Sequence, residues 1–350
     1  MAVIVLGAGA TRGCSFVHPT ANPCLPPLDG DFFTQLQRVL DRKHQDLIHD
    51  VMADVVEMFG PNFDVTMETV FTTLEHTLRM LETTGDNRDF KKEDLRDKRN
   101  RLVQAVQVVF EGSLPGKGQS GHSSRTPQEC THHLKLVRDI LRSGDEIVSF
   151  NYDCAVDYAL QNAGDGKWNA RYGYGFNLGP QGKALTGDKS WQPKDPAKKL
   201  DSIHLYKLHG SLHFHVPRSA GRLTVHLKER PYTKQRGNPK FTIIPPEWHK
   251  AYDKGVFTTL WQKAAAAIHH AEHLVLIGYS LRPTDLHSTA LFRTSVRKGK
   301  LKSLVVVNPD REARRRTRAV LLRGLSPDTR VLSFDLLSEF VAADQGIWRI

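Results

Sequence analysis

Two patterns of apolar and polar positions run along this chain. Short apolar runs predict buried strands, and apolar residues spaced by three and four positions predict amphipathic helices. The runs place strands at residues 2–6, 146–150, 202–208, 212–216, 223–227, 241–244, 273–277, 303–308 and 331–334. The helical spacing covers residues 31–40, 45–59, 65–81, 94–110, 130–142, 257–271, 285–297 and 311–322, with another helix starting near Asp153.

Strands alternate with helices through most of the chain, but four helical stretches follow one another without a strand before residue 112. Alternation of this kind is typical of a parallel sheet covered on both faces. We therefore expect an α/β fold: a Rossmann-like parallel sheet domain of residues 1–34 and 129–350, plus an inserted helical subdomain of residues 35–128. Residues 112–128 are rich in Gly, Ser and Pro and predict a flexible loop.

The first apolar run breaks directly into Gly7-Ala8-Gly9-Ala10-Thr11-Arg12-Gly13. Glycine lacks a Cβ, so such a loop can bring backbone amides against a ligand, and the helix that follows favours an anion such as a diphosphate. The spacing GxGxxxG is one residue longer than the dehydrogenase fingerprint. Taken alone, the loop is equally consistent with an ordinary tight turn.

Composition limits the classes of protein that the chain can belong to. With 350 residues and no long uninterrupted apolar stretch or signal peptide, it is expected to be a globular cytoplasmic protein without membrane contact. The formal net charge of +11 raises the expectation of an anionic partner such as a nucleotide or nucleic acid. The densest basic run, REARRRTR at residues 311–318, can equally be a solvated helix face.

The four cysteines stand at positions 14, 24, 130 and 154, with no CxxC pair and no regular histidine spacing around them. Neither a disulfide framework nor a structural zinc site is therefore expected, and we predict no metal.

Small and polar residues follow the predicted strands one after another. Because ligands bind at the carboxyl ends of parallel strands, these residues are the candidates for a site. In chain order they lie in Phe150-Asn151-Tyr152-Asp153, Leu208-His209-Gly210-Ser211, Gly278-Tyr279-Ser280-Leu281 followed by Thr284-Asp285, and Val307-Asn308-Pro309.

Together with the glycine loop, this ordered series resembles the sirtuin-like superfamily. The resemblance implies NAD+ as substrate, with Gly7, Ala8, Gly9, Ala10 and Thr11 lining the diphosphate and Asp153 beside the same site. It implies that Gly278, Ser280 and Asn308 hold the adenosine half, and we also count Asp285 among the residues that bind NAD+. Asn151 then matches the family's asparagine, which holds a water or the nicotinamide ribose, and His209 matches its general base. The roles of Arg12 and of Asp31 are left open.

Structural explanations compete with each of these assignments. Asn151 can simply cap the following helix, and His209 can be a buried core histidine. Ser280 and Asp285 can be turn and N-cap residues. His204, His213 and His215 read as alternating strand residues, without partners spaced for a metal.

Sirtuin deacetylases carry a small zinc lobe held by two cysteine pairs, which this chain lacks. In that respect the chain resembles the bacterial sirtuin-like NADases of anti-phage defence, in which water accepts the ADP-ribose and NAD+ is depleted. The resemblance implies abortive infection as the setting, a homo-oligomer, and a separately encoded partner such as a HerA-type ATPase or a short Argonaute.

Three other functions remain open from the sequence. The first is a regulatory subunit that senses NAD or ADP-ribose, or binds nucleic acid, without turnover. A nuclease is less favoured, because no carboxylate cluster suited to two Mg²⁺ ions is evident. A dehydrogenase is least favoured, because the Pro-rich segment stands where a second strand with a ribose-binding acid is expected.

Overall fold

The computed structural model describes residues 1–114, 129–164, 166–176, 202–216, 225–227, 241–246 and 255–349. The chain splits into two compact units. Unit 1 comprises residues 1–16, 129–229 and 252–350, and unit 2 comprises residues 17–128 and 230–251. That the chain has a sheet domain and an inserted subdomain, each folding independently, stays a prediction.

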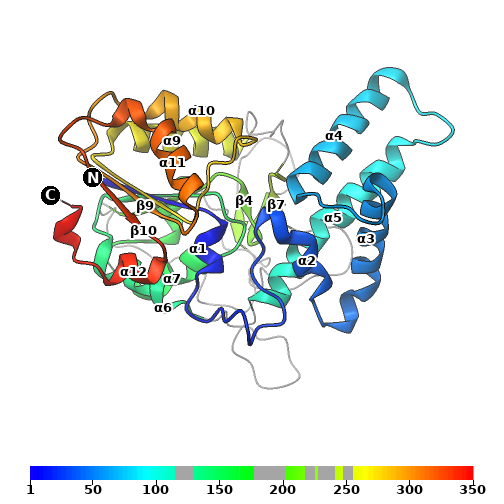
Figure 1. The fold of residues 1–350 in the computed structure, drawn as a ribbon, viewed down its shortest axis with the longest axis horizontal. Helices are drawn as coiled ribbons and strands as arrows, with labels where there is room; N and C mark the ends of the chain where they lie inside the picture. The colour runs from blue at the N-terminus through cyan, green and yellow to red at the C-terminus, as the bar shows by residue number, and fades with distance from the viewer. Residues whose placement is uncertain are drawn as a thin grey trace. The chain divides into compact units, whose positions relative to one another are not determined.

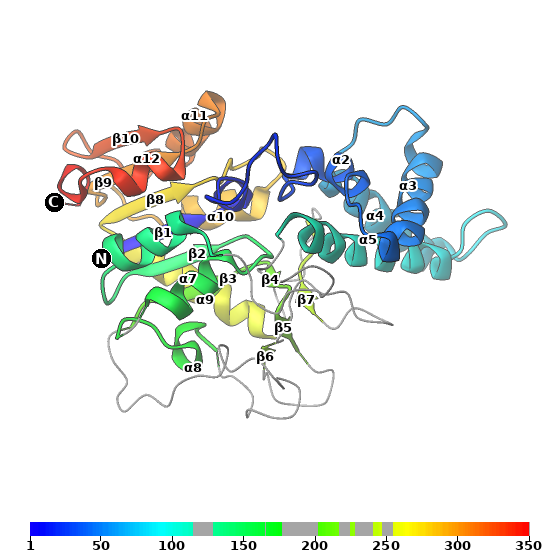
Figure 2. The same cartoon turned by 90° about the horizontal axis from the view of Figure 1, so that it is seen from below.

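Unit 1 is built on a six-stranded sheet in the order β10-β9-β8-β1-β2-β3, which Figure 2 shows in succession. Every neighbouring pair is parallel. Read from β3, the order is the 3-2-1-4-5-6 arrangement of a doubly wound nucleotide-binding fold. The strands are β1 (Ala2–Leu6), β2 (Glu146–Ser149), β3 (His204–Lys207), β8 (His273–Ile277), β9 (Ser303–Val307) and β10 (Arg330–Phe334). The expected Rossmann-like α/β class is thus confirmed.

Helices cover both faces of this sheet (Figure 1). One face carries α9 (Val256–His270), α10 (Leu286–Ser295) and α11 (Arg311–Val320), and the other carries α6 (Thr131–Lys135), α7 (Ala155–Ala163) and α12 (Leu337–Ala342). Strands β1, β8 and β9 are buried along their whole length, as is expected for a sheet covered on both sides. The short elements α1 (Ala8–Arg12), α8 (Ala170–Gly173), β4 (Gly210–Ser211), β5 (Phe214–His215) and β6 (His226–Leu227) complete the unit.

Unit 2 is mainly helical. Its helices are α2 (Phe32–Gln37), α3 (Gln45–Phe59), α4 (Met67–Thr84) and α5 (Lys92–Ser113), and it also holds the short strand β7 (Thr242–Ile243). Helix α5 packs against α2, α3 and α4, so it forms the centre of the unit. Among the described residues, no helix of either unit is long and apolar enough to cross a membrane.

The structure adjusts several expected boundaries. Helix α5 continues through Ser113 instead of giving way to a loop at residue 112, and Gly112 lies so close to Val39 that a Cβ would meet its side chain at 3.0 Å. The rest of that expected loop, residues 115–128, lies outside the described residues. The expected strand at 212–216 is reduced to β5 by a turn at residues 212–213. The expected helix at 130–142 is α6 followed by a π-helical turn at Leu136–Ile140.

Candidate active site at the carboxyl edge of the sheet

The carboxyl ends of the central strands form the candidate site. Strand order reverses between β1 and β8, and such a switch point is where an open parallel sheet leaves a crevice for a ligand. Backbone pairing continues beyond the strands here. The Gly7 amide donates to the Ile277 carbonyl oxygen at 2.9 Å, and the Phe150 amide donates to that of Leu6 at 3.0 Å. The residues that follow three neighbouring strands therefore start from one edge.

The glycines of the first loop are required by contact with the loop after β8. A Cβ on Gly7 would lie 2.6 Å from the Gly278 carbonyl oxygen, and a Cβ on Gly9 would lie 2.8 Å from the Gly278 Cα. Gly278 itself has a positive φ of 61°, and its Cβ would meet the Ala10 nitrogen at 2.1 Å. The Gly9 amide donates to the Gly278 carbonyl oxygen at 2.9 Å. These glycines are thus needed for the close packing of the two loops, independently of whether a ligand binds there.

Asn151 ties the end of β2 to the first loop. Its amide nitrogen donates to the Gly7 carbonyl oxygen at 2.9 Å and to the Thr11 hydroxyl at 3.1 Å. The Thr11 hydroxyl donates in turn to Asp153 Oδ2 at 2.6 Å. Since a backbone carbonyl can only accept, the orientation of the Asn151 amide is settled by this network. Its Oδ1 receives no hydrogen bond from the described residues, so it remains an acceptor.

The competing explanation for Asn151 is wrong, because the side chain does not cap α7. That helix starts at Ala155, and its first amide is bound by Asp153 Oδ1 at 2.9 Å. Asp153, which we assigned to the site, therefore both accepts from Thr11 and holds the start of α7.

Aromatic rings link His209 to the loop after β8. Phe150 stacks on Tyr279 with 4.3 Å between ring centroids and 2° between planes. The His209 ring meets the same Phe150 at 5.1 Å, in an edge-on arrangement. His209 is buried, and the carbonyl oxygen of the residue before it, Leu208, accepts from the Trp261 indole at 3.3 Å. The imidazole thus lies among aromatic rings at the carboxyl edge of the sheet.

The remaining candidates lie around Tyr279. The Tyr279 hydroxyl donates to Asp285, and the Asn308 amide nitrogen approaches the Tyr279 carbonyl oxygen at 3.5 Å. Asp285 is also the N-cap of α10, with its Oδ1 3.3 Å from the Ser288 amide. Asp285 therefore does act as an N-cap, as the structural explanation for this residue expects, and it also accepts the hydrogen bond of the Tyr279 hydroxyl. The carbonyl oxygen of Ser280 accepts a hydrogen bond from Arg316 Nε at 3.3 Å.

A buried polar network supports the strand that delivers His209. Lys207 is fully buried and pairs with Asp157 at 2.8 Å, and it also donates to the Asp153 carbonyl oxygen. Burial by itself would lower the pKa of Lys207, but the charge and hydrogen bond of Asp157, together with the other acidic groups nearby, outweigh burial and raise the pKa. The Tyr174 hydroxyl donates to Asp157 at 2.8 Å and lies 3.1 Å from His213 Nε2. Burial raises the pKa of Tyr174 well above its ordinary range.

Sequence reasoning missed this network. It treated His213 as one of several alternating strand residues, whereas the structure places His213 Nδ1 2.7 Å from the Cys154 sulfur, deep in unit 1. Burial raises the pKa of Cys154 well above its usual value, so its thiol is protonated and structural. The neighbouring His204 and His215 are only half-buried, as expected of alternation along a strand edge.

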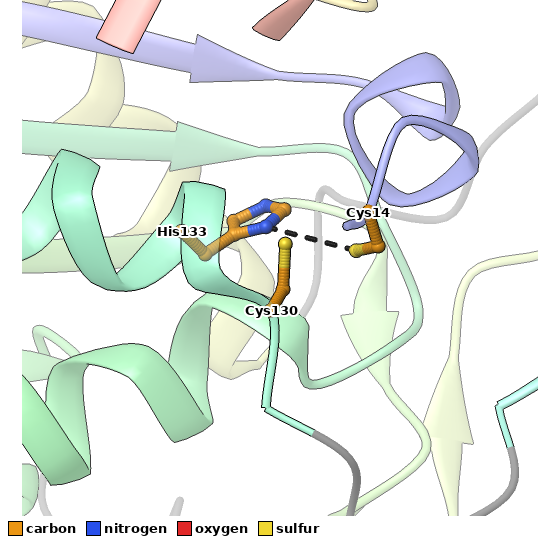
Figure 3. A group of neighbouring side chains, drawn as sticks. All are labelled: Cys14, Cys130 and His133. Atoms are coloured by element: carbon orange, nitrogen blue, oxygen red, sulfur yellow. Dashed lines mark hydrogen bonds between the residues drawn. The ribbon is translucent and has the colours of Figure 1, made fainter. Parts of the chain in front are cut away.

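Cys14, Cys130 and His133 form a second group that the sequence analysis missed (Figure 3). Cys14 follows the glycine loop, while Cys130 and His133 lie at the start of α6. The hydrogen bond from Cys14 and the charge of His133 lower the pKa of Cys130 to about 2, against the effect of burial. Burial raises the pKa of Cys14, and the Cys130 charge raises that of His133. The spacing Cys130-x-x-His133 was the available sequence signal.

Several arginines of the basic run at residues 311–318 are paired with acidic side chains. Arg314 pairs with Asp335, Arg315 with Glu312 at 3.0 Å, and Arg316 with Asp310 at 3.6 Å. Arg316 also reaches the Ser280 carbonyl, so α11 contributes positive charge to the loop after β8. These pairs reduce the charge available to an acidic partner.

The structure thus brings most of the predicted residues to one edge. Thr11, Asn151 and Asp153 are directly connected, and His209, Tyr279, Asp285 and Asn308 follow through Phe150. Ala8 is exposed at the start of α1. Asp31 belongs to unit 2, where its carboxylate accepts from the Leu28 amide at 2.7 Å and the Gln35 side chain at 3.2 Å.

A doubly wound sheet with a glycine loop at its switch point is the architecture typical of dinucleotide-binding proteins. A family model for the SIR2-like domain matches residues 145–325, more than half of the chain, and the chain belongs to this family. The match includes Asn151, His209, Gly278 and Asn308 but starts after the glycine loop. A search of curated proteins finds no significant match.

Proposed function

We propose that this chain is an NAD+ glycohydrolase that cleaves NAD+ to nicotinamide and ADP-ribose. The observation that carries the proposal is that Asn151 binds the glycine loop at the switch point, while the His209 ring packs against Phe150, the residue before Asn151, at the same carboxyl edge of the sheet. SIR2-like membership supports NAD+ as the molecule bound there.

The residues present fit this substrate. Cleavage breaks the bond between the ribose C1 carbon and the pyridinium nitrogen, whose positive charge is neutralised by the bonding electron pair. Water forms the new bond to C1 and loses a proton. Asn151 Oδ1, held by the amide contacts to Gly7 and Thr11, can accept a hydrogen bond from that water or from a ribose hydroxyl. His209 would take the proton, since imidazole exchanges protons near neutral pH.

Binding of the rest of NAD+ follows from the same edge. Residues 7–11 would lie along the diphosphate, and Gly278, Ser280, Asp285 and Asn308 along the adenosine. Arg316, which contacts the Ser280 carbonyl oxygen, adds a positive charge on that side. The stacked pair of Phe150 and Tyr279 offers an apolar wall for a planar ring.

We further propose that the enzyme acts in the cytoplasm as an effector of bacterial anti-phage defence. Uncontrolled NAD+ hydrolysis would poison the host, so activity is expected to depend on a homo-oligomer or a separately encoded partner. A HerA-type ATPase or a short Argonaute is the kind of partner that the family resemblance implies.

The test is release of nicotinamide from NAD+ by the purified chain, measured alone, with the product of the neighbouring gene, and with added DNA. Release under at least one of these conditions is expected. NAD+ or ADP-ribose binding without any release would instead favour a sensing subunit. A steep fall of DNA affinity with salt would favour a nucleic-acid-binding role.

A further inference from the structure

The group of Cys14, Cys130 and His133 has the composition of a soft-metal site. One ligand atom from each residue lies within 4.8 Å of the other two, and all three residues are buried. Figure 3 shows the three side chains directed toward one another, from the segment after α1 and from the start of α6. Two sulfurs and an imidazole nitrogen are the donors that Zn²⁺ and other thiophilic cations prefer.

The spacing of these atoms agrees with tetrahedral coordination. Bonds of about 2.3 Å to sulfur and about 2.0 Å to nitrogen place two such ligands about 3.6 Å apart around zinc. The Cys14 sulfur lies 3.7 Å from His133 Nδ1. Coordination would therefore need little movement of either side chain.

The two segments that carry the ligands are already joined without a metal. The Ser15 amide donates to the Cys130 sulfur at 3.4 Å, and the Thr131 amide donates to the Ser15 hydroxyl at 2.9 Å. His132 Nδ1 lies 3.2 Å from the Gly13 carbonyl oxygen. Outer contacts of this kind orient the ligands of metal sites.

Charge favours Zn²⁺ over Cu⁺ here. Two thiolates and one Zn²⁺ are neutral together, whereas two thiolates and Cu⁺ would leave a buried negative charge. A second group of possible metal ligands, in unit 2, consists of Asp41, His44 and Glu111. A cation already neutralises its carboxylates, because the Lys43 ammonium lies 2.9 Å from Asp41 and 2.5 Å from Glu111.

We propose that Cys14, Cys130 and His133 bind one Zn²⁺ ion, with water as the fourth ligand. Cys14 lies three positions after Thr11, so the ion would fasten the end of the glycine-loop segment to α6. The two cysteines of the site are far apart in the sequence and do not form a CxxC pair. Zinc binding by this site does not depend on the proposed NAD+ chemistry.

The test is binding of Zn²⁺ alone to the full chain, purified under reducing conditions and stripped with a chelator. Metal content after dialysis and competition with a chromophoric chelator give stoichiometry and affinity. Cobalt substitution gives a further readout, because thiolate-to-cobalt charge-transfer bands report sulfur ligation. One equivalent of Zn²⁺ per chain is expected for the wild type.

Cys130→Ser and His133→Gln should each weaken Zn²⁺ binding at least tenfold, about the loss that even outer-sphere changes cause at metal sites. Cys24→Ser is the matched control: Cys24 is also a buried cysteine outside any disulfide but belongs to unit 2, and its variant should bind as the wild type does. Circular dichroism checks that each variant is folded.

A folded wild type that binds no Zn²⁺, or a Cys130→Ser variant that binds it undiminished, would overturn the proposal. So would a clear preference for Cu⁺ over Zn²⁺. A Cys14–Cys130 disulfide found by mass spectrometry in the protein as isolated from cells, in place of metal, would overturn it as well.

Discussion

The Asn151 amide nitrogen donates to the carbonyl oxygen of Gly7 at 2.9 Å, across 144 positions of the chain. This bond joins the ends of two neighbouring parallel strands at the edge where a ligand is expected. It also orients the Asn151 amide, because the Gly7 carbonyl can pair only with the nitrogen. The Asn151 side chain therefore does not cap a helix, and its Oδ1 is held in place as a hydrogen-bond acceptor.

Asn151→Asp should therefore be more harmful than its small size change implies. The carboxylate has no hydrogen to donate, so an oxygen would face the Gly7 carbonyl, with a loss of about 1–3 kcal/mol in unfolding free energy. Nicotinamide release should fall as well, as it should in Asn151→Ala. Chemical denaturation and the release assay measure the two effects.

The matched control for this change is Asn162→Asp. Asn162 is exposed on α7 and binds Glu129 at 2.7 Å. This variant should keep the wild-type rate and lose little stability. Equal effects at both positions would show that the Gly7 contact has no special importance.

Gly278→Ala should destabilise the loops at the switch point. Gly278 has a φ of 61°, and the new Cβ would lie 2.1 Å from the Ala10 nitrogen. Gly299 has the same φ of 61°, but its nearest neighbour would be 4.0 Å away. Gly299→Ala thus measures the backbone cost alone, about 1 kcal/mol. Gly278→Ala should cost clearly more by denaturant unfolding, and similar losses would argue against the close packing of the two loops.

Lys207→Met should be among the most destabilising single changes in unit 1. It would leave Asp157 buried without its cation, at a cost of about 3–5 kcal/mol. Replacing both residues, as in Lys207→Met with Asp157→Leu, should cost less than the sum of the single changes. A double-mutant cycle in urea measures this coupling, and simple additivity would contradict the buried pair.

The same pair gives stability a pH dependence at the alkaline side. The pKa of Lys207 is raised in the folded chain, so its contribution is fully present below the pKa of an unfolded lysine. It is lost as pH rises toward the folded value. Wild-type unfolding free energy should therefore fall above about pH 10.4, the ordinary lysine pKa. The double variant should show a flatter profile in that range.

Much of this architecture was readable from periodicity. The expected helix at residues 45–59 coincides with α3, and the expected strand at 273–277 coincides with β8. Both are sustained patterns with clear ends, so local spacing was sufficient. The strand ends also predicted which residues meet, since parallel strands bring their carboxyl ends to one edge.

Contacts between distant segments were not readable in this way. The Cys154–His213 pair joins the N-cap of α7 to the turn between β4 and β5, and nothing in local spacing indicates it. Cys14 and Cys130 stand on opposite sides of the helical unit in the sequence. Only the spacing Cys130-x-x-His133 is local, and one such pair does not by itself indicate a metal site. The pairing of Arg314 could not be predicted either, because its partner Asp335 follows β10, 21 positions along the chain.

Nicotinamide release by wild type, His209→Ala and His270→Ala, compared under the condition that activates the wild type, tests whether His209 is the general base of NAD+ cleavage. His270 is exposed on α9 and serves as the matched control. We expect a rate at least about 100-fold lower for His209→Ala, the range expected on losing a general base, with an unchanged melting temperature. His270→Ala should match the wild type. Wild-type turnover by a folded His209→Ala protein would contradict the account.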